Sequence, residues 1–505
     1  MYGCPNCGQN LKFDIRRQMM HCDYCDTVMD PYAITEKTEA VMHKENVEGD
    51  NDTGAHMQVI VYTCPQCGGE IVSDDNEAMV FCSFCGASTP LNARMSDMRR
   101  PELIIPFSKT KEDCANAYQK LTRRALFAPK EVKDPSHISG FRAIYMPYWI
   151  YDFERSGDTK YSAKHSYQKG DYEYTDHYSV STNVKIKYDG VNFDASSSFS
   201  DNLSQAIAPY DIRQAKPFTT AFMSGFYADL MDVPAETYEF LAKTAVSEDA
   251  ADKLQSNQRS AQYTIDHKSV VKAVWPDTVK QTLAMLPVWF MSYKTRDKKG
   301  NERVLYSVVN GQTGEAVADL PISIKKYIVS SLVAAVPLFI LLNIFLTLRP
   351  TTLLWAAVVI SVLCLIGLYY EVRKITYQEY NVDDLGVMSL TRQSSLKQEK
   401  RKIVRTVANP DGTFREETVD MSKLVSEEWK KEWRKNRLYF FISLICAAVC
   451  LFLLPVQDIY YYFGVVITGI CNCLMMVNIM LRYNMLTSRP LPQFKKKGGD
   501  DSAKF

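Results

Sequence analysis

Cys4-Pro5-Asn6-Cys7 lies near the start of this chain, and Cys22-Asp23-Tyr24-Cys25 follows after a spacer of fourteen residues. The pattern returns, with every cysteine offset by sixty positions, as Cys64-Pro65-Gln66-Cys67 and Cys82-Ser83-Phe84-Cys85. Two Cys-x-x-Cys turns supply four thiolates, which is a ligand set that structural Zn²⁺ prefers. The sequence therefore predicts two bound zinc ions, the first held by Cys4, Cys7, Cys22 and Cys25 and the second by Cys64, Cys67, Cys82 and Cys85.

Each cysteine set predicts a small zinc ribbon, over residues 1–35 and 61–95, with an acidic linker over residues 36–60 between them. Gly8, Gly68 and Gly86 directly follow a cysteine and allow the positive φ that such turns favour. A redox dithiol and an iron–sulfur site are the alternatives. Four sulfurs complete a zinc shell and leave no open position for catalysis, so structural zinc is the favoured interpretation, and we expect the metal to fold the ribbons.

The first residues, Met1-Tyr2-Gly3, lack the basic and apolar segments of a secretory signal peptide. We therefore expect the ribbons to lie in the cytosol, where thiols stay reduced and paired cysteines favour metal over disulfides. The formal net charge of +1 gives the whole chain no general attraction to nucleic acid or anionic lipid.

Residues 101–325 predict a mixed α+β cytosolic domain that is rich in strands. Within it, Met146–Ile150 (Met-Pro-Tyr-Trp-Ile) is echoed by Leu286–Phe290 (Leu-Pro-Val-Trp-Phe), which predicts an internal duplication. Each echo opens an extended stretch that we expect to end at a charged turn, Arg155–Asp158 in the first and Arg296–Gly300 in the second. Four aromatic residues are expected to pack the core rather than stack on a ligand: Tyr145, Tyr148, Trp149 and Trp289.

The last third of the chain predicts an α-helical membrane module. Four apolar stretches are long enough to cross a bilayer core of roughly 30 Å, namely Ile328–Leu348, Thr352–Tyr370, Leu438–Val456 and Ile459–Leu481. Short connections pair them as two transmembrane hairpins, over residues 326–370 and 438–482. A basic loop (371–437) separates the hairpins and a basic tail (483–505) follows. By the positive-inside rule, this predicts a multi-pass plasma-membrane protein with both termini cytoplasmic.

Three asparagines stand out among the polar residues inside the spans: Asn343, Asn472 and Asn478. A conduction path is one interpretation. Hydrogen bonding between helices is favoured, because none of the four stretches contains an acidic or basic side chain.

Charge and motifs disfavour two function classes. Through residue 100 the chain has eight Lys and Arg against fifteen Asp and Glu, a net charge of −7, although phosphate binding needs the opposite sign. Arg16-Arg17 is a minimal basic patch, and nucleic acid is not an expected partner. Phosphate-binding loops, His-Glu-x-x-His and Gly-x-Ser-x-Gly are missing, so we predict no catalytic residues and no enzymatic activity.

The chain resembles a family of bacterial membrane proteins with TFIIB-type zinc ribbons. Residues 1–325 carry the resemblance through the Cys-Pro-x-Cys ribbons and an ordered set of motifs: Ile104–Phe107, Ala125–Pro129, Tyr145–Trp149, Ala208–Asp211, Pro217-Phe218, Leu286–Trp289 and Asn310–Gly314. The resemblance implies a link to phage-shock and flotillin-like envelope-stress proteins, which such relatives help place at the membrane. Similar chains also attract replication-helicase labels, but this sequence has no phosphate loop for that activity.

Together these features favour a non-enzymatic, zinc-binding membrane scaffold that recruits a protein partner, of phage-shock or flotillin-like type, to the cytosolic face. A channel or transporter accessory subunit is one alternative, which a stripe of polar residues facing a pore would support. A membrane-tethered nucleic-acid-binding protein is the other, which salt-dependent retention of DNA would reveal.

Overall fold

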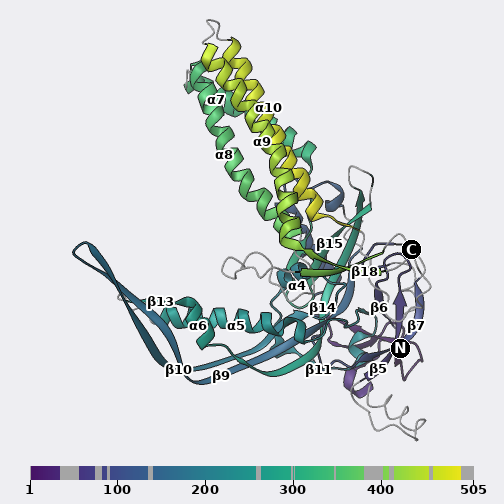
Figure 1. Ribbon diagram of the computed structural model, residues 1–505. Coiled ribbons are helices and arrows are strands. Elements are labelled where there is room, and N and C mark those ends of the chain that lie inside the picture. The colour runs from purple at the N-terminus through teal and green to yellow at the C-terminus, as the bar shows by residue number, and fades with distance from the viewer. Residues whose placement is uncertain are drawn as a thin grey trace.

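The computed structural model has a body rich in strands, from which a bundle of apolar helices rises and a long two-stranded arm extends (Figure 1). The structure describes residues 2–34, 56–73, 82–87, 91–134, 140–257, 263–296, 300, 302–345, 349–379, 402–408, 414–453 and 459–490. Most of the predicted acidic linker and residues 491–505 of the predicted tail lie outside these ranges.

Two long hairpins form the centre of the large sheet. β9 (Arg142–Lys169) pairs with β10 (Tyr172–Asp194), and β14 (Asp277–Arg296) pairs with β15 (Glu302–Asn310). β9 and β14 are themselves antiparallel neighbours, with the two echoed segments opposite each other. Each echo therefore lies in the first strand of one of two adjacent hairpins.

The first of the two expected charged turns is wrong. Arg155–Asp158 lies inside β9, where every residue has a partner on β10. The strand continues to Lys169, and the chain reverses only at Gly170 and Asp171. Continuous cross-strand pairing explains the difference, because it satisfies the backbone through a segment that has turn-like composition. β14 ends at Arg296, the first residue of the second expected turn, and residues 297–299 of that turn lie outside the described ranges.

Shorter elements complete the body. α2 (Lys111–Arg124) begins with a capping box, in which Thr110 and Asp113 each accept a hydrogen bond from the other's amide. The remaining elements are β8 (Leu103–Ile104), α4 (Asp201–Ile207), β11 (Lys216–Pro217), β12 (Tyr227–Ala228), α5 (Glu236–Asn257), β13 (Thr264–Ile265), α6 (His267–Ala273), β16 (Ala316–Ala318) and the 3-10 helices Glu131–Lys133, Ile212–Gln214 and Thr220–Met223.

The aromatic residues of the quoted motifs lie in the core. Tyr145, Tyr148, Trp149 and Trp289 are all buried, which confirms their predicted packing role. The ring of Phe107 contacts those of Tyr145 and Trp289 at centroid distances of 5.0 and 5.5 Å. These residues belong to three separate motifs, so folding brings together what the sequence holds up to 182 positions apart.

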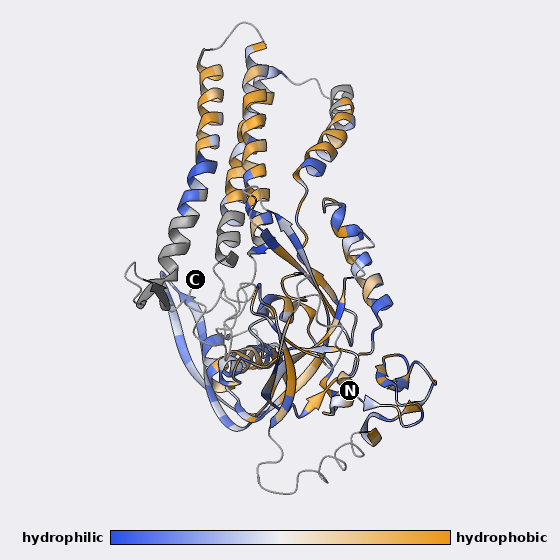
Figure 2. Cartoon of the chain, turned by 90° about the vertical axis from the view of Figure 1, so that its right-hand side faces the viewer, coloured by the Kyte–Doolittle hydropathy of each residue, from blue (hydrophilic) through white to orange (hydrophobic). Residues whose placement is uncertain are grey.

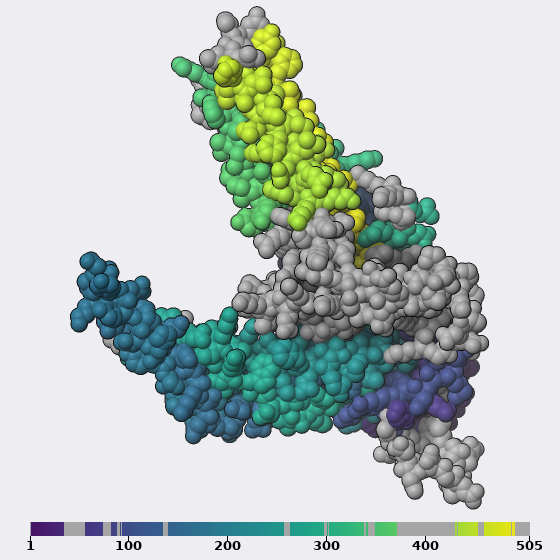
Figure 3. Space-filling view, viewed as in Figure 1, coloured from purple at the N-terminus to yellow at the C-terminus, as the bar shows by residue number. Residues whose placement is uncertain are grey.

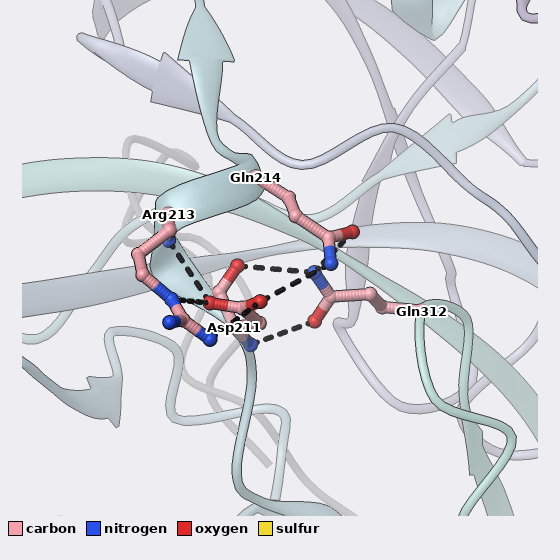
Figure 4. Close-up of polar contacts among 4 residues, drawn as sticks. All are labelled: Asp211, Arg213, Gln214 and Gln312. Atoms are coloured by element: carbon pink, nitrogen blue, oxygen red, sulfur yellow. Dashed lines mark hydrogen bonds and ion pairs between the residues drawn. The ribbon is translucent and has the colours of Figure 1, made fainter.

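Hydrogen bonds join two further motifs, Ala208–Asp211 and Asn310–Gly314 (Figure 4). Gln312 accepts a hydrogen bond from the Asp211 amide at 2.9 Å and donates to the Asp211 carbonyl at 3.1 Å. The Arg213 side chain pairs with the Asp211 carboxylate at 2.8 Å. Gly311 is required here, because a Cβ would lie 2.6 Å from the Phe107 ring. The turn after β15 and the segment after α4 are therefore joined structurally.

The apolar C-terminal helices are α7 (Ile324–Phe345), α8 (Pro350–Glu379), α9 (Met421–Leu453) and α10 (Ile459–Thr487). Figure 2 shows α7 apart from the other three, which pack together through Leu354, Ala447 and Tyr461. Large apolar side chains cover their outer surfaces.

Among the described residues, three helices are long and apolar enough to cross a membrane, rather than the four predicted: Pro350–Tyr370, Trp433–Phe452 and Ile459–Met485. The first predicted span falls on α7. That helix ends at Phe345, short of the expected Leu348, and residues 346–348 lie outside the described ranges.

The predicted loop of residues 371–437 contains regular structure. α8 continues to Glu379, β17 (Lys402–Ala408) pairs with β18 (Phe414–Asp420), and α9 begins at Met421. The charged residues before the third predicted span therefore belong to the same helix as the span itself. Trp433 of α9 contacts Tyr369 of α8 at a ring distance of 5.1 Å.

Candidate metal centres and the membrane junction

The four Cys-x-x-Cys turns share one hydrogen-bond pattern. In each, the amide of the first cysteine donates to the carbonyl five residues later, and the amide four residues later donates back to the cysteine carbonyl, at 2.7–3.0 Å. The residue in that fourth position has positive φ: Gly8 (75°), Gly68 (76°) and Gly86 (67°), as predicted, and Asp26 (54°). The backbone hydrogen bonds of these turns therefore position the thiols without a metal ion.

The first cysteine set lies in a small sheet of its own, formed by β1 (Tyr2–Gly3), β2 (Asn10–Asp14), β3 (Met19–Cys22) and β4 (Val28–Met29). Its Sγ atoms pair at 3.5 Å, Cys4 with Cys25 and Cys7 with Cys22. Cys4 and Cys22 are buried, Cys7 is half-buried and Cys25 is exposed. One side of this set therefore faces solvent.

This small sheet docks on the body through β2. The Phe13 amide donates to the Ser224 carbonyl at 3.1 Å, and the Ser224 hydroxyl donates to the Leu11 carbonyl at 2.6 Å. The rings of Phe13 and Phe222 meet edge to face at 5.2 Å. The first unit is thus attached to the body while keeping a separate sheet.

The second cysteine set lies inside the body. Its Sγ distances are 3.8 Å between Cys64 and Cys85 and 3.6 Å between Cys67 and Cys82, and no side chain of the four is more than 2% exposed. Phe84, between the last two cysteines, packs against Phe290 of β14 at a ring distance of 5.9 Å.

The strands around the second set are β5 (His56–Thr63), β6 (Glu70–Val72) and β7 (Asn92–Arg99), and they belong to the large sheet. β6 pairs with β12, placing Val72 opposite Ala228. This arrangement differs from the predicted division between residues 61–95 and 101–325, because sheet and core run across that boundary. The residue types at one equivalent position did hold a signal. The second set has the apolar Phe84, which is fully buried, where the first set has Tyr24, which is 78% exposed.

The structure thus brings all eight predicted cysteines into two groups that can hold a metal ion, with the ligand atoms of each group within 4.8 Å of one another. Zn–S bonds of about 2.3 Å would place tetrahedral sulfurs about 3.8 Å apart, close to the observed separations. These separations also exclude disulfides, whose S–S bonds are about 2.05 Å.

The buried thiols differ in acidity. Hydrogen bonding with Cys67 lowers the pKa of Cys64, whereas hydrogen bonding with Cys64 raises the pKa of Cys82. Four thiols this close do not ionise together unless a cation compensates their charge. The donor set therefore fits a cation that binds thiolates.

Neighbouring residues outside the two sets have other partners. His21 lies between Asp23 and Asp26, with nitrogen–oxygen distances of 3.2 and 3.0 Å, and is not a member of the first set. Arg16 pairs with Glu112 at 3.2 Å and Arg17 with Asp14 at 3.7 Å. Both arginines of the small basic patch therefore have a carboxylate partner in the same chain.

Helix α10 returns to the body at its end. Asn484 bonds to both the amide and the carbonyl of Ile322, each at 2.7 Å. The Arg303 guanidinium donates to the Ser488 hydroxyl at 2.8 Å. β19 (Arg489–Pro490) then pairs with β15, and Arg489 lies 5.5 Å from the centre of the Tyr306 ring. The end of the last helix is therefore part of the body.

The beginning of α7 is attached nearby. Ser323 donates its amide to the Phe127 carbonyl at 2.8 Å, and Lys326 donates to the Ala128 carbonyl at 2.6 Å. Phe127 also contacts the Tyr327 ring at 5.2 Å. The Ala125–Pro129 motif thus attaches the start of α7 to the body, close to Ile322, which binds the end of α10.

Polar residues of the bundle bond to one another between helices. Asn478 donates to Asn436 at 3.3 Å, and the hydroxyls of Ser361 and Ser443 are 3.3 Å apart. For these residues the structure supports helix-to-helix hydrogen bonding over a conduction path.

The chain is similar to "Uncharacterized protein YdjG" of Bacillus subtilis (strain 168), with 26% identity over 329 residues, covering 64% of this chain and 91% of YdjG. No family model matches the chain, and no solved structure matches it.

Proposed function

We propose that the chain is a non-enzymatic, zinc-carrying scaffold that is anchored in the plasma membrane and recruits a partner protein to the cytosolic face. The observation that carries the proposal is the junction of the body with α7 and α10. Hydrogen bonds at Ile322, Arg303 and Asn484 and the strand β19 make the body continuous with the membrane helices. Such an attachment suits a protein whose task is to hold another at a fixed place.

The junction also supports the proposed topology. The start of α7 and the end of α10 lie together on the body, so the chain leaves and re-enters on one side. That arrangement needs an even number of crossings, with α7 as the fourth span beside the three candidates. Basic residues such as Lys325 and Lys326 beside this junction favour the cytosolic side.

Two Zn²⁺ ions fit the cysteine sets as structural ions. Cys4, Cys7, Cys22 and Cys25 would hold one, and Cys64, Cys67, Cys82 and Cys85 the other. Four protein ligands leave no coordination position for a substrate, and the second set is buried. The ions would supply folding energy rather than chemistry.

The partner we propose is a flotillin-like or phage-shock protein, as the family resemblance implies. The test is the location of a fluorescent flotillin-like protein in cells that lack the chain. Expression of the full chain should place that protein at the membrane, whereas residues 325–505, the helices alone, should reach the membrane and recruit nothing. The scaffold would be rejected if the flotillin-like protein reached the membrane equally well without the chain. It would also be rejected if the helices alone fully restored that location, and this second result would favour a transporter accessory subunit.

A further inference from the structure

The arm is the outer part of the hairpin of β9 and β10, and it stands clear of the body (Figure 3). Its strands pair without interruption from Phe153 opposite Tyr188 to Lys169 opposite Tyr172. Because strand side chains alternate between faces, odd-numbered residues of β9 and even-numbered residues of β10 share one face here. The opposite face carries only polar side chains, such as Lys160, Lys187 and Glu173.

Among the described residues, helices cover the first face near the body, and Tyr263 contacts Tyr178 farther out at a ring distance of 5.1 Å. Near the body, Tyr161 and Val184 pack against Ala251 of α5 and Val270 of α6. Farther out the same face carries four tyrosines that are 41–72% exposed: Tyr167, Tyr172, Tyr174 and Tyr178. Helices α5 and α6 bury this face near the body but leave the outer tyrosines exposed. Exposed aromatic side chains are typical of a surface that binds protein.

The arm also has an open edge. Among the described strands β10 pairs only with β9, so its outer edge offers backbone groups to a further strand. The charges along this edge are divided: Glu173 and Asp176 lie toward the tip, and Lys185 and Lys187 lie toward the body. Lys187 contacts Asp189 of its own strand at 3.0 Å, yet its side chain remains 66% exposed.

We propose that the outer edge of β10 pairs with the same edge of a second copy of this chain, in antiparallel orientation. A two-fold axis at Val180 places Glu173 opposite Lys187 of the second copy, and the symmetry repeats that pair. The same register places Tyr174 opposite Ile186 of the second copy and Tyr172 opposite its Tyr188. The exposed tyrosines of one arm then lie beside the helix-covered base of the other.

The membrane module is compatible with this pairing. The axis that relates two antiparallel strands is perpendicular to their sheet. Helices α5 and α6 cover the arm on the side from which the bundle rises (Figure 1). A rotation about this axis keeps each face of the sheet on its own side, so both bundles rise on the same side of the combined sheet, as a closed two-fold assembly in one bilayer requires.

The test measures the mass of the full-length chain in detergent across a range of concentrations by sedimentation. The unaltered chain should dimerise. Glu173→Lys and Lys187→Glu should each weaken the dimer by roughly tenfold, since an attractive cross-strand pair becomes repulsive at two symmetric places. The double variant should recover the original affinity. Lys160→Glu, on the same face but on the inner strand β9, is the matched control and should change nothing.

Thermal unfolding at a concentration at which every variant is monomeric separates a lost contact from a lost fold. The substituted side chains are exposed, so the melting temperature of the monomer should stay unchanged. The proposed register would be overturned if neither single substitution changed the affinity of the dimer. It would also be overturned if the double variant did not recover the original affinity. A chain that stays monomeric at every concentration would overturn the proposal and leave the open edge to a strand of a different protein.

Discussion

The two cysteine sets have the same spacing and the same turn hydrogen bonds, yet they occupy different environments. The first has a sheet of its own and turns Cys25 toward solvent, whereas the second has all four thiols buried in the core of the body. The comparison shows that the same local motif can gather four thiols on a separate small sheet or inside an apolar core.

The largest expected effect comes from removing one ligand of each set. Cys82→Ser should abolish folding of the body, because structural zinc contributes on the order of 10 kcal/mol per site, comparable with the whole stability of a domain. Cys22→Ser should release one zinc and expose residues 2–34 to protease, with the body still folded, because the first sheet is separate. Zinc content and limited proteolysis of the full chain measure both.

The control for this pair is Cys114→Ser. Cys114, at 1% exposed, is as buried as Cys22 and Cys82 but belongs to neither set, so Cys114→Ser should reduce stability by about 1 kcal/mol. A Cys82→Ser chain that resists protease as well as the control would show that the second ion is dispensable. Collapse of the body in Cys22→Ser would show that the two units are one.

The ligands were predictable from sequence because two Cys-x-x-Cys turns and their glycines act within a few residues. The embedding of the second set was not, because it depends on pairing between Val72 and Ala228, 156 positions apart. Nor did the composition of Arg155–Asp158 reveal that β10 pairs with β9 through this segment. The arm and its open edge follow from that long pairing and were missed with it.

The next effect sharpens the comparison within the turns themselves. Phe84→Ala should destabilise the body by about 3–5 kcal/mol, because a large buried side chain leaves a cavity against Phe290. Tyr24→Ala, at the equivalent exposed position, should change stability by less than about 0.5 kcal/mol. Chemical denaturation of the two variants measures the difference; equal losses would contradict the contrast between buried and exposed sets.

A smaller effect depends on pH. Asp229 directly follows β12, which pairs with β6 beside the second cysteine set. Burial raises the pKa of its carboxyl to about 7. The folded protein then keeps a proton that the unfolded chain releases above about pH 4, so this group stabilises the fold at low pH and loses that contribution as pH rises through 7. Between pH 5 and 7 the chain should lose about 2 kcal/mol relative to Asp229→Asn.

Glu112→Gln is the control for the pH experiment, because the Glu112 side chain is 75% exposed and its ion pair with Arg16 lies on the surface. Denaturation midpoints at pH 5, 6 and 7 should change little between this variant and the unaltered chain. If Asp229→Asn followed the pH dependence of the unaltered chain, the buried carboxyl would not be the source of the slope.

The smallest effect concerns Asp26, which occupies the position that glycine fills in the other three turns and has a φ of 54°. Asp26→Gly relieves a backbone conformation that costs about 1 kcal/mol. It also loses the 3.0 Å contact with His21 and adds freedom to the unfolded chain, so stability should stay within about 0.5 kcal/mol of the original. Asp26→Ala loses the same contact and keeps the strain, so it should be about 1 kcal/mol less stable than Asp26→Gly. Competition with a chelator for the first zinc ion measures both variants, with the second ion as internal reference. If the alanine variant held zinc as well as the glycine variant, positive φ would not be a requirement of this turn.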